Sequence, residues 1–121
     1  MGSLLQIRVS AWTFDPAEVE RRWPRLVALG FSPPTLFEQE KGVLQLVDNL
    51  ADRLEIGILP EEAARELAGG IKKAAAARVR LDAALAEWDA RVANTATDEI
   101  EDALDELESQ AKRLKDQPGR D

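Results

Sequence analysis

The chain of 121 residues contains no cysteine, no histidine and no tyrosine. Without cysteine it can form no disulfide, no thiolate nucleophile and no cysteine-based zinc site. Without histidine it lacks the commonest metal ligand and the side chain whose ordinary pKa suits proton transfer near neutrality. The same absence excludes the Ser–His and Cys–His pairs of nucleophilic enzymes. We therefore expect no catalytic site, no metal and no cofactor.

Glycine and proline are also scarce, at 7 and 6 residues, and no apolar run approaches the roughly 18 residues that span a bilayer. No secretion signal is visible at the N-terminus, and residues 1–3 are typical of an expression scar. These features predict a cytoplasmic protein that does not bind membranes. The charged residues make up 32% of the chain, which favours long, exposed helices.

One segment near the N-terminus has the pattern of a β-strand. Apolar and polar residues alternate over residues 4–14, which is typical of a half-buried strand. The apolar members are Leu5, Ile7 and Val9, and Trp12 lies on the opposite face. A single strand leaves its backbone hydrogen-bonding groups without partners. We therefore expect it to pair with residues 54–59, with the same strand of a second copy, or with another protein.

Residues 15–57 are predicted to form a helical core. Asp15 and Pro16 mark a strong helix start, because aspartate caps a first turn and proline fits the first helical position. Pro24 removes a backbone donor, which predicts a kink at Trp23 or two short helices. Gly30 is then expected to end this helical region as a C′ glycine.

The next helix is predicted to begin at a capping box formed by Thr35 and Glu38 and to end near Gly57. The alternation of Leu54, Ile56 and Ile58 is also compatible with a short strand. The helix ending is favoured, because a glycine followed by an apolar residue is typical of a Schellman motif.

Residues 60–115 are predicted to form long helices. Pro60 with Glu61 opens the first of them, since proline and acidic groups suit a helix N-terminus. Gly69 and Gly70 are expected to bend or break it, as a hinge or a packing point, because each glycine costs about 1 kcal/mol relative to alanine. The polar residues 94–97 predict a turn into the last helix, residues 98–115.

The last helix carries a narrow apolar seam of the coiled-coil type. Its members are Ile100, Leu104, Leu107, Ala111 and Leu114. The seam can pack in cis on residues 71–93, as an antiparallel hairpin, or in trans on a second chain. In a hairpin that turns at residues 94–97, Lys72 would lie far from the acidic residues that match it in charge. This mismatch slightly favours packing in trans, and we expect a homodimer.

The acidic run over residues 98–108 suits a cation site, a face for a basic partner, or a mimic of nucleic-acid phosphates. Its spacing matches no EF-hand loop, and di-iron carboxylate helices also need histidine. A solvated helix face is therefore the favoured interpretation. Basic residues at 21–25 and 72–80 are interleaved with acidic ones, and the net charge is −7, which disfavours nucleic-acid binding.

The whole pattern predicts a mainly α protein: a helical bundle of about four to five helices with one N-terminal strand and a coiled-coil-like C-terminal hairpin. It forms a single domain over residues 4–115, followed by a polar tail at 116–121. The favoured function is non-enzymatic protein–protein interaction or oligomeric assembly, as a homodimer or with an unidentified protein. The alternatives are a regulator that binds or mimics nucleic acid, and an enzyme that uses carboxylates alone. The interface candidates are Leu5, Ile7, Val9, Trp12, Trp88, Ile100, Leu104, Leu107 and Leu114, the tryptophans because they are enriched in binding hot spots.

Overall fold

The computed structural model describes residues 11, 13, 15–31 and 41–115. This part of the chain forms the helices α1 (Pro16–Arg22), α2 (Pro24–Phe31), α3 (Val43–Ile56), α4 (Glu61–Ala86) and α5 (Ala90–Lys115). The prediction of a mainly helical protein is confirmed. The strand predicted over residues 4–14, with Leu5, Ile7, Val9 and Trp12, falls outside the described residues except for Ala11 and Thr13.

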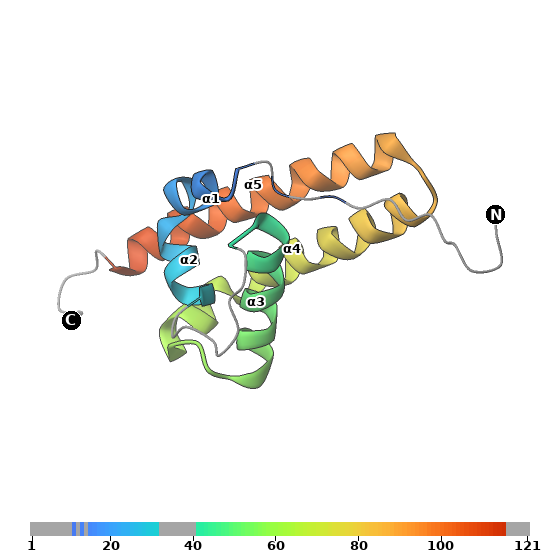
Figure 1. Cartoon of the computed structure of the whole chain (residues 1–121). Helices are drawn as coiled ribbons and strands as arrows, with labels where there is room; N and C mark the ends of the chain where they lie inside the picture. Colours follow the sequence, from blue (N-terminus) through green and yellow to red (C-terminus); the bar gives the residue numbers. More distant parts are fainter. Residues whose placement is uncertain (1–10, 12, 14, 32–40, 116–121) are drawn as a thin grey trace, which may run out of the picture.

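Helices α4 and α5 form a long antiparallel hairpin, and α1, α2 and α3 pack against the end that lies far from its turn (Figure 1). The largest fully buried side chains come from α2, α3, α4 and α5: Leu26, Leu46, Leu50, Leu67, Ile71, Leu81, Ile100, Leu104 and Leu107. The turn of the hairpin projects away from α1–α3 (Figure 1). The core of the described chain therefore includes all the helices at the end far from the turn, and only α4 and α5 near the turn.

The turn between the two long helices lies at residues 87–89, and the predicted turn at residues 94–97 is wrong. The hydroxyl groups of Thr95 and Thr97 donate to the carbonyls of Arg91 and Asn94, at 3.1 and 2.7 Å, inside α5. These side chains are thus accommodated by the helix instead of capping its end. The N-terminal cap is Asp89, whose carboxylate accepts from the Val92 amide at 3.1 Å.

The position of the turn also decides how the apolar seam packs. Ile100, Leu104 and Leu107 are buried within the same chain, against α4 and the helices beside it. The predicted preference for packing in trans is therefore wrong for this seam. A turn at residues 87–89 brings Gly70 against Leu107 and pairs Arg80 with Glu99 at 2.7 Å, so the charges match within the hairpin.

Helix α4 runs without interruption through Gly69 and Gly70, so the predicted break is wrong and the packing-point alternative holds for Gly70. A Cβ atom on Gly70 would lie 2.5 Å from the Leu107 side chain, which shows how closely α5 approaches here. Packing against α5 outweighs the roughly 1 kcal/mol that each glycine costs in a helix.

The predicted break at Trp23 is confirmed, because α1 ends at Arg22 and α2 begins at Pro24. The predicted Asp15 cap is also confirmed, since the Asp15 carboxylate accepts from the Ala17 amide at 3.1 Å. Gly30, however, is not a C′ glycine, because α2 continues through it to Phe31. A Cβ atom on Gly30 would lie 2.9 Å from the Leu46 side chain, so this glycine is needed for close packing on α3.

Helix α3 begins later than predicted, at Val43, whose amide donates to the Thr13 hydroxyl at 2.8 Å. The predicted start at Thr35 and Glu38 lies outside the described residues. The predicted end is confirmed: Gly57 has φ 78, and its amide and that of Ile58 both donate to the Arg53 carbonyl at 3.1 Å. Leu54 to Ile56 are therefore helical, and they form no strand.

Candidate interaction surface of the α4–α5 hairpin

The hairpin exposes large apolar side chains on α4, at its turn and at the start of α5. Val79 of α4 is 67% exposed, Trp88 of the turn 66%, and Val92 of α5 44%. Two further exposed side chains, Ile56 and Ile58, lie at the end of α3 and in the loop that follows it. Isolated apolar residues on a surface are ordinary, so the case for a site depends on how these residues are held.

Trp88 is held in a backbone conformation that disfavours it. It has φ 60, and among the described residues no other non-glycine residue has a positive φ. The Asp89 amide donates to the Ala84 carbonyl at 2.8 Å and the Trp88 amide to that of Leu85 at 3.2 Å, which makes a Schellman motif. Trp88 occupies the C′ position that glycine usually takes, at a cost of roughly 1–2 kcal/mol for a side chain with a Cβ atom.

The outward face of α4, defined here as Ala76, Val79, Ala83 and Ala86, is exposed and apolar. These residues recur at intervals of three and four, so they form one stripe along the helix. The stripe lies opposite the buried one that contacts α5. Because three of its four side chains are methyl groups, the backbone of another helix can approach it closely.

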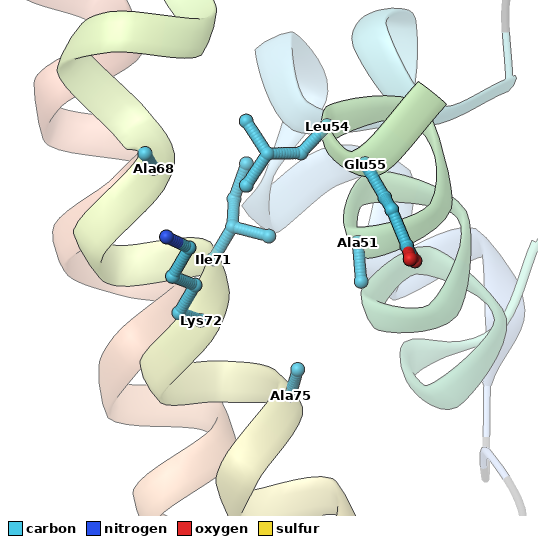
Figure 2. A pocket seen from close by; sticks show the side chains of 7 residues that line it. All are labelled: Ala51, Leu54, Glu55, Ala68, Ile71, Lys72 and Ala75. Carbon is cyan, nitrogen blue, oxygen red and sulfur yellow. The ribbon is translucent and has the colours of Figure 1, made fainter. Parts of the chain in front are cut away.

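A groove of about 530 Å³ lies between α3 and α4 (Figure 2). Its lining is Ala51, Leu54 and Glu55 from α3 and Ala68, Ile71, Lys72 and Ala75 from α4. The Lys72 ammonium and the Glu55 carboxylate lie on opposite sides of it (Figure 2). Since Ala75 precedes Val79 by one turn of α4, the groove lies beside the outward face.

The acidic run of α5 is a docking face for the chain's own α1 and α2. Asp105 accepts two hydrogen bonds from the Arg22 guanidinium, at 3.0 and 2.9 Å, and one from Trp23 Nε1 at 2.8 Å. The Arg22 hydrogen bond lowers the pKa of Asp105, against the opposing effect of partial burial, and Trp23 adds to the lowering. Arg22 also pairs with Glu101 at 3.1 Å and lies 4.7 Å from the Trp23 ring centroid.

Glu108 of α5 also belongs to this face, and it caps the N-terminus of α2 although the two lie far apart in the sequence. Its carboxylate accepts from the backbone amides of Arg25 and Leu26, both at 3.1 Å, in the first turn of α2. It also lies 3.4 Å from the Arg25 guanidinium. The solvated-face interpretation therefore holds for the exposed Asp98, Asp102 and Glu106 but not for Glu101, Asp105 and Glu108.

The spacing of the acidic residues is the sequence signal for this docking. Glu101, Asp105 and Glu108 are spaced by four and three residues, so they share one face of the helix. Their negative charge complements the positive charge of Arg21, Arg22 and Arg25. Among the predicted interface residues in the described part, the four apolar residues of α5 belong to the interior or its edge, and Trp88 lies at the surface.

Within residues 11, 13, 15–31 and 41–115, no three acidic side chains converge as a metal would require. In the same residues, no helix has the length and apolar character needed to cross a bilayer. Comparison with protein-family models, curated proteins and solved structures found no match to this chain.

Proposed function

We propose that this protein is a non-enzymatic protein-interaction module whose binding surface is the outward face of α4, the adjoining groove and the hairpin turn. The observation that carries the proposal is Trp88, which is both 66% exposed and held at φ 60. Tryptophan is enriched among the residues that dominate binding energies, because it offers a large, stiff apolar area.

The two properties of Trp88 point the same way. A side chain that is mostly exposed contributes little burial to the monomer, and the left-handed backbone adds strain of roughly 1–2 kcal/mol. The fold as described therefore gains little from a tryptophan at a position where glycine would be easier. Binding a protein partner would bury the indole ring, and the free energy of that burial would offset the backbone strain.

Surrounding features support a surface that contacts protein. The turn is rigidly defined by its two Schellman hydrogen bonds and by the Asp89 cap, so the indole ring is presented from a preorganised backbone. Val79 and Val92, which precede and follow the turn in sequence, are further exposed apolar side chains.

A photo-crosslinking phenylalanine analogue at position 88, in the full chain and in the cells that make it, tests the proposal. We expect covalent adducts with protein from position 88. The same analogue at Asp102, an exposed position on α5, is the matched control and should give none. Equal adduct yields from the two positions, or none from position 88, would overturn the proposal.

A further inference from the structure

We infer that the protein partner of this surface is a second copy of the chain, bound antiparallel through α4. The inference rests on the proposed function and gives it a partner and a register. Its first basis is the distribution of charge along α4 and the turn. Over residues 72–89, which follow the acidic start of α4 at Glu61 and Glu62, the basic residues come first, Lys72, Lys73, Arg78 and Arg80, and the acidic ones follow, Asp82, Glu87 and Asp89. A helix with this polarity is complementary in charge to an antiparallel copy of itself.

The charges select one register. With the two-fold axis beside residue 80, Lys73 of each copy faces Glu87 of the other, and Arg78 faces Asp82. Within one chain Arg78 already bonds to Asp82 and lies 3.4 Å from Asp48. The two-fold axis would place the Arg78–Asp82 pair of one copy beside that of the other, so that each arginine faces an aspartate of the other copy. Lys73 and Glu87 are exposed and lie about 21 Å apart along a single helix, so only a second copy can bring them together.

The apolar residues fit the same register independently of the charges. The axis beside residue 80 places Val79 of one copy against Val79 of the other, with Ala76 and Ala83 on either side. Alanine side chains let the two helices approach closely, as at other helix contacts lined by small residues. Val79 is 67% exposed in the single chain, so its exposure is explained by this contact.

The register also gives Trp88 a place to bind. It brings Trp88 of each copy beside Lys72 and Ala75 of the other, at the alanine-lined groove between α3 and α4 (Figure 2). A groove of about 530 Å³ can hold an indole ring. The arrangement is reciprocal, as a two-fold interface requires: each copy contributes one turn and one groove.

The first test is the solution mass of the full chain, by light scattering during size-exclusion chromatography, over a dilution series in the micromolar range. A single helix face with two turns is small for a stable interface, so we expect a dimer that dissociates on dilution. Val79→Lys should shift dissociation at least tenfold toward monomer, because it places two like charges together at the axis. Ile58→Lys, at a similarly exposed residue outside the interface, should leave the mass unchanged.

The second test is charge reversal. Lys73→Glu and Glu87→Lys should each weaken the dimer several-fold, and the double variant Lys73→Glu/Glu87→Lys should restore it. Because the two positions are remote within one chain, such rescue would place them together across the axis. Thermal unfolding of each variant at low concentration checks that the monomer still folds.

Two results would overturn the inference, and each leaves the proposed function separately testable. A parent chain that stays monomeric at every concentration excludes a second copy as partner, while adducts from position 88 with another protein would still support an interaction module. A dimer that Val79→Lys does not weaken, or that the double charge reversal does not restore, excludes this face and register.

Discussion

Gly70 of α4 and Leu107 of α5 are packed so closely that a Cβ atom on Gly70 would lie 2.5 Å from Leu107 Cδ2 and 2.9 Å from its Cγ. Leu107 is fully buried, so it has little room to move away. The two residues therefore form a close contact between the hairpin helices, whereas the neighbouring Gly69 has nothing within 4 Å of its Cβ position.

We expect Gly70→Ala to lower the free energy of unfolding by about 1–2 kcal/mol, because overpacking outweighs the gain in helix propensity. Gly69→Ala is the matched control and should raise it by about 0.5–1 kcal/mol, since only the propensity changes there. Urea unfolding followed by circular dichroism measures both. Stabilisation by both substitutions would contradict the close contact.

Trp88 should be a residue that the monomer can lose without harm. We expect Trp88→Gly to be about 1 kcal/mol more stable than Trp88→Ala, because glycine relieves the left-handed strain that alanine keeps. Comparing these two variants removes the effect of the lost indole ring. The measurement is thermal and urea unfolding at concentrations where the chain is monomeric, and equal stabilities would mean that φ 60 carries no strain here.

Asp105 should make the stability of the fold sensitive to acid. Its pKa is lowered in the folded chain, chiefly by the Arg22 hydrogen bond, so the unfolded chain binds the proton more readily. The resulting stability is complete above the unfolded pKa of about 3.9 and is lost as the pH falls through the lower folded pKa.

We therefore expect Asp105→Asn to lower the free energy of unfolding at neutral pH by about 1 kcal/mol or less, because the pair is half exposed. The same variant should lose less stability than the parent below about pH 4. Asp102→Asn removes the same charge from an exposed site and is the control. Identical acid dependence in the parent and Asp105→Asn would show that the Arg22 pair does not act in solution.

Glu108 should hold the first turn of α2 in place. We expect Glu108→Ala to cost about 1–2 kcal/mol, because the amides of Arg25 and Leu26 lose their acceptor. Glu108→Gln keeps an acceptor oxygen and should cost less. Hydrogen exchange should show the loss as faster exchange at Arg25 and Leu26 in the alanine variant, and unchanged exchange there would refute the capping role.

The helical class and several local boundaries were predictable because they depend on neighbouring residues. Asp15 before Pro16, Pro24 after Trp23, and Gly57 before Ile58 each set a helix end through their own backbone or side-chain chemistry. The turn of the hairpin was predicted wrongly, because Trp88 fitted an apolar stripe while Thr95 and Thr97 looked like caps. Asp89 was the usable signal, since a capping residue there starts α5.

The candidate surface could be predicted only in part. Trp88 was named from its residue type, but its exposure follows from a turn position that the sequence pattern misplaced. The predicted seam of Ile100, Leu104 and Leu107 is real as a pattern, yet it faces the chain's own helices. Periodicity shows that one helix face is apolar, and it does not show which neighbour covers that face.

By itself, then, the sequence determined that the chain is mainly helical and set the helix ends at Asp15, Trp23 and Gly57, because propensity, capping and proline chemistry act over a few residues. It also excluded cysteine and histidine chemistry outright. The tertiary structure alone decided that Gly70 is a packing point, that the acidic run of α5 binds Arg22 and caps α2, and that Val79 and Trp88 remain exposed. Those outcomes depend on the register between helices far apart in the chain, which is set by how their surfaces fit together.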